Sequence, residues 1–192
     1  MSRTDDSLSD EQLVKLYREG DQQAMEQLVE RYQAKVFGFF KRLCWNRTLA
    51  EDLAQDTFIK VISSLRQKEP EVPFSMVLFH IARIHWYTYL RKKYRTVKTV
   101  GKIEEHGDVI PGEESVGEDL EEFDERKQKI KLMKKAMESL SPEKRIVVEL
   151  SYFLEVPYKE IAQILEIPIG TVKSRLNSAI RRLRGIMESD EN

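Results

Sequence analysis

Residues 158–184 constrain the fold more than any other part of this chain, because they read as two short helices separated by a tight break. Ile161, Ala162 and Leu165 share one face of the first helix. Pro168 ends that helix or opens the next, because its ring cannot sit inside a helix. Apolar side chains then recur at spacings of three and four along the second helix, at Ile169, Val172, Leu176, Ile180 and Leu183. This pattern predicts a helix-turn-helix.

The second of these helices is basic on the side away from its apolar stripe. A helix-turn-helix places such a helix in the DNA major groove. There, Arg and Lys bond guanine edges or phosphates, Asn bonds adenine, and Ser and Thr adapt to either. The side chains predicted to face DNA are Thr171, Lys173, Ser174, Arg175, Asn177, Ser178, Arg181 and Arg182. The alternative is an amphipathic core helix with a solvated basic face.

Charge is distributed unevenly along the chain, although the net charge is only −1. Residues 74–103 hold seven bases and no acid, and residues 104–125 hold eleven acids and neither Lys nor Arg. Residues 126–187 hold fourteen bases against six acids. Basic clusters favour contact with a polyanion, and the acidic run between them favours a solvated tether or a nucleic-acid mimic.

Composition favours a helical protein that does not insert into a membrane. Charged residues make up 34% of the 192, and Gly and Pro together number only fourteen (8 + 6). No apolar run approaches the roughly 18 residues of a membrane span, and no signal peptide opens the chain. The single cysteine, Cys44, excludes an internal disulfide. A cytoplasmic location is therefore expected.

Periodicity and helix breakers predict an all-α fold of two small helical domains joined by an acidic flexible linker, with the helix-turn-helix in the C-terminal domain. Ser9 is expected to cap the first helix, and Thr48 with Glu51 forms a capping-box pair for the third. A fourth helix is expected over 74–94. The expected boundaries are 1–95 for the first domain, 96–120 for the linker and 121–192 for the second domain.

Nothing in the sequence points to catalysis. Metal-ligand spacing, a Gly-rich phosphate loop and a nucleophile elbow are all missing from the sequence. Neither enzyme activity nor a cofactor or metal is expected.

A second candidate nucleic-acid surface lies in residues 74–95, where aromatic residues alternate with bases. Flat rings stack on unpaired bases while cations follow phosphates. Trp86, Tyr89 and Lys93 recur at spacings of three and four, so they share a helix face. For Trp86 and Tyr89, packing in the core is an equally open reading. The basic run 91–95 is expected to contact phosphates.

These segments together resemble a bacterial extracytoplasmic-function (ECF) sigma factor of the sigma-70 family over nearly the whole chain. Residues 50–62 are similar to the region that grips the clamp helices of RNA polymerase. Residues 74–83 and 90–93 are similar to the promoter-melting region. Residues 140–184 are similar to the region that reads the minus-35 element, and within them Thr171–Leu176 is the most specific match.

The resemblance implies a sigma factor that binds core RNA polymerase and promoter DNA, with an anti-sigma factor as a further partner. It implies that residues 66–73 capture a flipped minus-10 base. The expected polymerase-binding residues are Asp52, Gln55, Asp56 and Phe58. The expected minus-10 residues are Arg83, Trp86, Tyr89, Arg91 and Lys92. The expected minus-35 residues are Thr171, Lys173, Ser174, Arg175, Asn177, Arg181 and Arg182.

Five positions depart from the pattern of the family. Val77 replaces Trp, Ile84 replaces Asn, and Thr88 replaces Asp or Asn. In the helix-turn-helix, Glu166 replaces the usual turn Gly and Pro168 replaces a Ser or Thr cap. Two other functions stay open at this point. One is a stand-alone helix-turn-helix regulator with an N-terminal sensor domain, which binds duplex DNA unaided. The other is a helical adaptor whose basic face is incidental.

Overall fold

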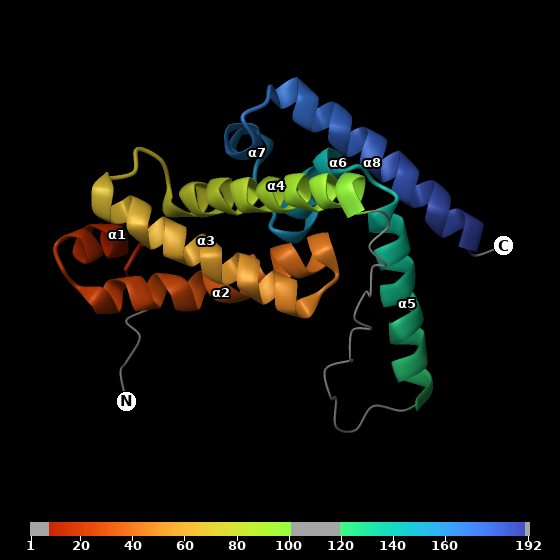
Figure 1. Ribbon diagram of the computed structural model, residues 1–192, viewed down its shortest axis with the longest axis horizontal. Coiled ribbons are helices and arrows are strands. Elements are labelled where there is room, and N and C mark those ends of the chain that lie inside the picture. Colours follow the sequence, from red (N-terminus) through yellow and green to blue (C-terminus); the bar gives the residue numbers. More distant parts are fainter. Residues whose placement is uncertain (1–7, 101–119, 191–192) are drawn as a thin grey trace. The chain divides into compact units, whose positions relative to one another are not determined.

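The computed structural model describes residues 8–100 and 120–190, and every regular element in these two stretches is a helix (Figure 1). The all-α prediction is therefore confirmed. The elements are α1 (Asp10–Arg18), α2 (Gln22–Cys44), α3 (Arg47–Gln67), α4 (Phe74–Val100), α5 (Leu120–Glu138), α6 (Pro142–Val148), the π-helical turn η1 (Glu149–Phe153), α7 (Tyr158–Leu165) and α8 (Ile169–Asp190). Residues 101–119, most of the predicted linker, lie outside the described residues.

The chain divides into two compact units. The first contains α1, α3, α4 and α2 as far as Lys41. The second contains α5 to α8 together with Arg42–Arg47.

The start of α1 follows the prediction made from Ser9. Ser9 Oγ accepts a hydrogen bond from the Gln12 amide at 3.3 Å, and Gln12 Oε1 accepts one from the Ser9 amide at 2.8 Å. This reciprocal pair satisfies two amide groups at the helix N-terminus. α1 ends just before Gly20, whose φ of 111° lies in the region that favours glycine.

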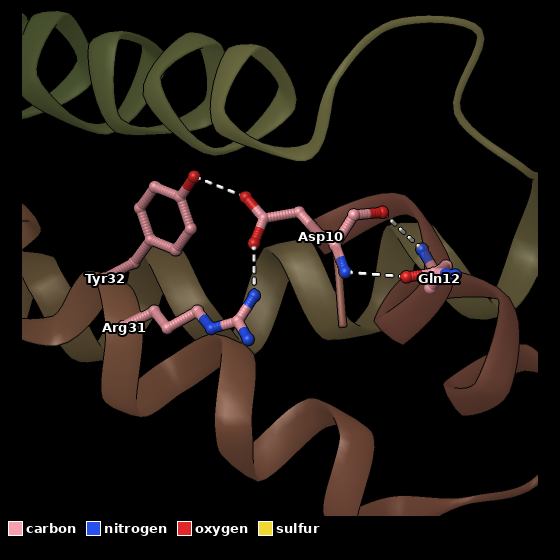
Figure 2. A network of polar contacts seen from close by, with 5 residues as sticks. Asp10, Gln12, Arg31 and Tyr32 are labelled. Carbon is pink, nitrogen blue, oxygen red and sulfur yellow. Dashed lines mark hydrogen bonds and ion pairs between the residues drawn. The ribbon is translucent and has the colours of Figure 1, made fainter. Parts of the chain in front are cut away.

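Asp10 ties α1 to α2, as Figure 2 shows. Its carboxylate accepts hydrogen bonds from Arg31 Nη1 at 3.0 Å and from the Tyr32 hydroxyl at 2.5 Å. Burial, and then the bond to Asp10, raises the pKa of Tyr32, so the phenol keeps its proton and remains a donor. The Tyr32 ring meets Phe74 of α4 edge-on, with 5.3 Å between centroids. The network therefore also fixes the start of α4.

Two arginines hold the C-terminal end of α3 against α1. Arg18 Nη1 donates a hydrogen bond to the Leu65 carbonyl oxygen. Arg66 Nε donates one to the Tyr17 hydroxyl at 2.7 Å. The end of α3, and with it the beginning of the 66–73 loop, is thereby positioned by α1.

The core of the first unit is built on aromatic rings. Phe39 of α2 meets two rings edge-on: its neighbour Phe40, with 5.1 Å between centroids, and Phe79 of α4, with 5.7 Å between centroids. Such edge-to-face pairs add to the stabilisation from buried area. The largest fully buried side chains of this unit are Leu13, Leu28, Phe39, Phe40, Leu65, Phe74 and Leu78.

Two helix limits in the first unit differ from the prediction. α3 begins at Arg47, so Thr48 lies inside its first turn and does not cap it. α4 continues to Val100 instead of stopping near Tyr94. No glycine or proline occurs in α4 after Pro73, and Gly101 is the first breaker, so the helical conformation is kept for another turn.

The second unit is centred on α6 and α8. Ser141 and Pro142 open α6, with proline at the start of the helix. α6 ends at Val148, because the backbone widens there into η1. The buried apolar side chains of this unit include Met137, Leu140, Ile146, Val147, Leu150, Ile161, Ile164, Leu165, Val172, Leu176 and Ala179.

Candidate nucleic-acid interface

The turn between α7 and α8 is closed by its backbone and not by glycine. Glu166 has φ 53° and ψ 46°, a left-handed conformation at the end of α7. The Ile167 amide donates to the Ala162 carbonyl at 3.0 Å, which satisfies one of the last acceptors of α7. The Pro168 carbonyl accepts from the Thr171 and Val172 amides at 2.8 and 3.2 Å. Of the two roles predicted for Pro168, it therefore opens the second helix.

α7 and α8 pack together through much of the predicted apolar faces, although Ala162, Ile180 and Leu183 are only partly buried. Ile161 and Leu165 of α7 are buried, as are Val172 and Leu176 of α8. Ile169 was expected in the same stripe, but it is 45% exposed. It occupies the first position of α8, where the helix has only just begun to cross its partner.

α8 carries all seven residues predicted for the minus-35 contact, five of them exposed. Ser174, Asn177 and Arg181 are exposed and follow one another at spacings of three and four. They lie opposite the buried Val172 and Leu176. Lys173 and Arg182 are also exposed, whereas Thr171 and Arg175 are partly buried. One helix thus presents cationic, amide and hydroxyl groups together, the mixture suited to base edges and phosphates.

α4 divides the predicted minus-10 residues into outer and inner groups. Arg91 and Lys92 are exposed, and Arg83 is partly buried. Trp86 is only 3% exposed, and its ring stacks on Tyr89 with 5.6 Å between centroids and 26° between planes. The Trp86 ring therefore packs in the core.

The burial of Trp86 has a sequence signal in its spacing. Leu78, Ala82 and Trp86 are four residues apart, and all three are buried. The apolar spacing of four along this helix could therefore have placed Trp86 in the core. The opposite side of α4 exposes Ile84 by 41% and Tyr94 by 57%, with Tyr87 partly exposed between them. None of the three was among the predicted minus-10 residues, although Tyr94 lies in the run 91–95 that was expected to contact phosphates.

α3 presents an acidic face. Asp52, Gln55 and Asp56 are exposed, and Phe58 is partly buried. Ile59 on the same helix is 58% exposed. This combination of carboxylates and an exposed apolar side chain suits a protein partner with basic and apolar groups.

A buried threonine links α3 to α4 behind this face. Thr57 Oγ1 donates to the Leu53 carbonyl at 2.7 Å and lies 3.3 Å from His85 Nδ1. Burial lowers the pKa of His85, and the nearby Asp56 opposes that shift. The ring is therefore mainly neutral at neutral pH.

Within the part of the chain that the structure describes, no His, Cys, Asp or Glu side chains form a group of three able to hold a metal. No helix in that part is both long and apolar enough to cross a membrane.

Comparison with known proteins matches each of the two units to a region of the sigma-70 factors. Residues 28–96 match sigma-70 region 2, and residues 130–183 match sigma-70 region 4. The chain is 30% identical to the ECF RNA polymerase sigma factor SigW of Bacillus subtilis over 183 residues, which cover 89% of this chain and 92% of that protein. It belongs to the ECF sigma factors. The ECF RNA polymerase sigma-E factor of Escherichia coli is 32% identical over 177 residues, covering 89% of this chain and 90% of that protein.

Two solved structures show the same fold. The sigma factor RpoE of Bartonella quintana, crystallised with the anti-sigma factor NepR, superposes with a TM-score of 0.69 at 27% identity, covering 86% of this chain and 97% of RpoE. CnrH, in complex with the cytosolic domain of CnrY, has a TM-score of 0.67 at 20% identity, covering 94% of this chain and 98% of CnrH, which supports the fold alone.

The region matches place α3 and α4 in region 2, and the helix-turn-helix α7–α8 in region 4. The predicted membership of the ECF sigma factors is confirmed. A stand-alone helix-turn-helix regulator is not favoured, because such a protein does not account for the region 2 match.

Proposed function

We propose that this ECF sigma factor binds core RNA polymerase, reads the minus-35 element with α8 and opens the minus-10 element with α4. The observation that carries the proposal is the pair of basic helix faces, one in each unit, within the two matched sigma regions. Each face alone suits DNA, and a two-part promoter needs both. The chain acts by binding, without catalysis of its own, and works in the cytoplasm with the polymerase.

In the minus-35 contact, the outer side of α8 enters the major groove. Ser174 and Asn177 lie at its centre and reach base edges, while Arg181 reaches farther because of its longer side chain. Lys173 and Arg182 flank this line and contact phosphates on the two sides of the groove. Thr171 and Arg175, which are partly buried, complete the edge of the contact.

In the minus-10 contact, Arg91 and Lys92 hold the phosphates of the opening strand, and Arg83 extends this cationic line toward the start of α4. Trp86 supports the helix from the inside, and Tyr89 packs on it. The 66–73 loop, which Arg18 and Arg66 position, captures a flipped base.

The polymerase contact uses the exposed face of α3. Asp52, Gln55 and Asp56 engage basic groups of the core enzyme, and Phe58 contributes apolar contact at the margin of this face. The link from Thr57 to α4 holds this face at a fixed distance from the DNA-binding helix.

An anti-sigma factor is the proposed regulator. RpoE was solved with the anti-sigma factor NepR bound, and CnrH was solved in complex with the cytosolic domain of CnrY. The second unit offers a groove of about 770 Å³ between α5, η1 and α8. Met133, Tyr152 and Met187 on its walls are exposed, and Lys129, Arg184 and Glu188 also line it. Largely apolar walls with a few charged groups fit the apolar face of an amphipathic helix.

DNA binding with and without core polymerase tests the proposal. Fluorescence anisotropy of a labelled promoter duplex is measured with the chain alone, with core alone and with both. We expect sequence-specific, salt-sensitive binding only with both together. Specific binding of equal affinity by the chain alone would support a stand-alone regulator instead, and no salt-sensitive binding in any mixture would support an adaptor.

A further inference from the structure

Two exposed methionines line the groove between α5, η1 and α8. Met133 of α5 is 37% exposed and Met187 of α8 is 52% exposed. Met187 continues the apolar spacing of α8, because it follows Ile180 and Leu183 at seven and four residues. The two thioethers therefore belong to the walls of one surface, although they come from different helices.

Burial separates these two methionines from the others that the structure describes. Met25, Met76 and Met137 are each at most 7% exposed. Met137 also lines the groove, but on its buried side, four residues after Met133. An oxidant must reach a thioether to react with it, so within the described residues oxidation of methionine is directed to the groove walls.

The chemistry of the thioether decides how such a groove behaves. Methionine is flexible and apolar, so a wall built from it adapts to the apolar face of a docked helix. Methionine sulfoxide is polar, and it disrupts surfaces of this kind. The neighbouring Leu132, Phe153 and Leu183 carry no sulfur and stay apolar. A change at two positions therefore makes both walls polar.

We propose that Met133 and Met187 form a reversible oxidation site whose sulfoxides close this groove to the helix of its regulator, an inference that rests on the proposed docking role of the groove. In the reduced state the walls are apolar and the regulator holds the chain. In the oxidised state the groove no longer captures the regulator, and the chain is free to engage core polymerase. Methionine sulfoxide reductases restore the thioethers and with them the capture.

The oxidant is a hydroperoxide. The thioether sulfur attacks the terminal peroxide oxygen, a sulfur–oxygen bond forms, and the oxygen–oxygen bond breaks. The departing oxygen takes the proton from the transferred hydroxyl and leaves as water or as an alcohol. Sulfur gives up two electrons and the peroxide accepts both, so no further reductant or cofactor takes part.

A docked helix covers the same thioethers that the peroxide attacks. Oxidation therefore acts on the free groove, and an occupied groove is protected. The switch works by preventing renewed capture after the regulator has dissociated. Because occupancy and oxidation exclude each other, a bound apolar probe should slow the oxidation of Met133 and Met187 and leave the slow oxidation of Met25 unchanged.

Mass spectrometry and dye binding on the full chain test the proposal. The chain is treated with hydrogen peroxide, digested, and mapped for sulfoxide at each methionine. The probe for the groove is 8-anilinonaphthalene-1-sulfonate, whose fluorescence rises on exposed apolar surface. We expect sulfoxide first at Met133 and Met187, and binding of the dye weakened by about tenfold, because the apolar contacts of two side chains are lost. Treatment with methionine sulfoxide reductases should restore it.

Three double variants control the experiment. Met133→Leu with Met187→Leu keeps apolar walls of similar volume without sulfur, so it should bind the dye normally before and after peroxide. Met133→Gln with Met187→Gln places polar side chains of similar length there, and should bind the dye about tenfold more weakly without peroxide. Met25→Leu with Met76→Leu is the matched control, and should respond to peroxide as the unmodified chain does. The melting temperature of the oxidised chain verifies that the second unit stays folded.

Three outcomes would overturn the oxidation site. One is sulfoxide at Met25, Met76 or Met137 as early as at the two groove positions. The second is unchanged dye binding by the oxidised chain. The third is a loss of dye binding on peroxide treatment in the leucine variant. If the reduced, unmodified chain bound the dye no better than the glutamine variant, the proposed docking role of the groove would fail and the oxidation site with it, a result that differs from all three.

Discussion

Replacing Trp86 separates a supporting role from a direct DNA contact. The side chain is 3% exposed and stacks on Tyr89, so truncation to alanine removes core packing. Replacing a buried tryptophan by alanine costs about 3–5 kcal/mol, a range that includes the lost stacking on Tyr89. Against a total stability of about 5–15 kcal/mol, Trp86→Ala should leave the first unit close to unfolding.

Trp86→Phe should behave very differently. Phenylalanine keeps a ring for Tyr89, and among the described residues no acceptor reaches the buried Trp86 Nε1. An unsatisfied buried donor costs about 1–3 kcal/mol, which offsets the burial lost with the smaller ring. The net change in the free energy of unfolding should therefore lie within about 1 kcal/mol of zero.

Urea unfolding of the full chain, followed by circular dichroism, measures both variants. Strand opening by the corresponding holoenzymes is measured with 2-aminopurine on a promoter duplex. Tyr94→Ala is the matched surface control, since Tyr94 is 57% exposed and its removal should change stability by less than about 0.5 kcal/mol. Normal stability of Trp86→Ala would refute the packing argument. A stable Trp86→Phe that failed in strand opening would show that the indole contacts DNA.

Three further predictions concern single side chains. Glu166→Gly should raise the free energy of unfolding of the second unit by roughly 1 kcal/mol, because glycine adopts the left-handed turn without a Cβ clash; urea unfolding that shows no gain would contradict this. Arg181→Ala should weaken holoenzyme binding to the minus-35 duplex by about tenfold, and Lys159→Ala, an exposed cation on α7, should not; equal losses would remove the special role of Arg181. Burial lowers the pKa of His85 below 6.5, so the stability that its neutral ring contributes is complete above that pH and is lost as the pH falls through the lowered pKa. Unfolding measured from about pH 7.5 to about pH 5.5 should show a smaller fall for His85→Gln, and an equal fall would contradict the assignment.

Spacing and capping predicted most of the helical framework, because these are local signals. Ser9 caps α1 as expected, since a serine with a glutamine three residues later can close both hydrogen bonds without tertiary help. Pro142 similarly marks the start of α6. The Thr48–Glu51 pair did not mark the start of α3, because Arg47 is already helical and Thr48 lies inside the first turn. The pair matches the capping-box pattern equally well inside the helix, so the pattern alone could not reveal the difference.

The candidate site was predictable on α8 and only partly so on α4. On α8 the apolar stripe and the polar face are cleanly divided, so Ser174, Asn177 and Arg181 could be assigned outward from spacing. α4 carries aromatic residues on both sides, and composition cannot tell which ones face the core. Trp86 turned inward, whereas Tyr94 and Ile84 turned outward.

The turn before α8 could not be foreseen from residue preferences. Glutamate rarely adopts the left-handed conformation. Here Glu166 is held in it by the packing of α7 on α8 and by the hydrogen bond that the Ile167 amide donates to the Ala162 carbonyl. The widening of α6 into η1 likewise has no local sequence signal that would have predicted it.

Run-off transcription with core RNA polymerase tests the central claim most directly. The templates are a library of genomic promoter fragments from the source cell, transcribed with and without the chain. We predict new transcripts with defined start sites that appear only when the chain is added, and that disappear with a variant lacking the outer cations of α8 at Arg181 and Arg182. Transcription that never depends on the chain across the library would contradict the account.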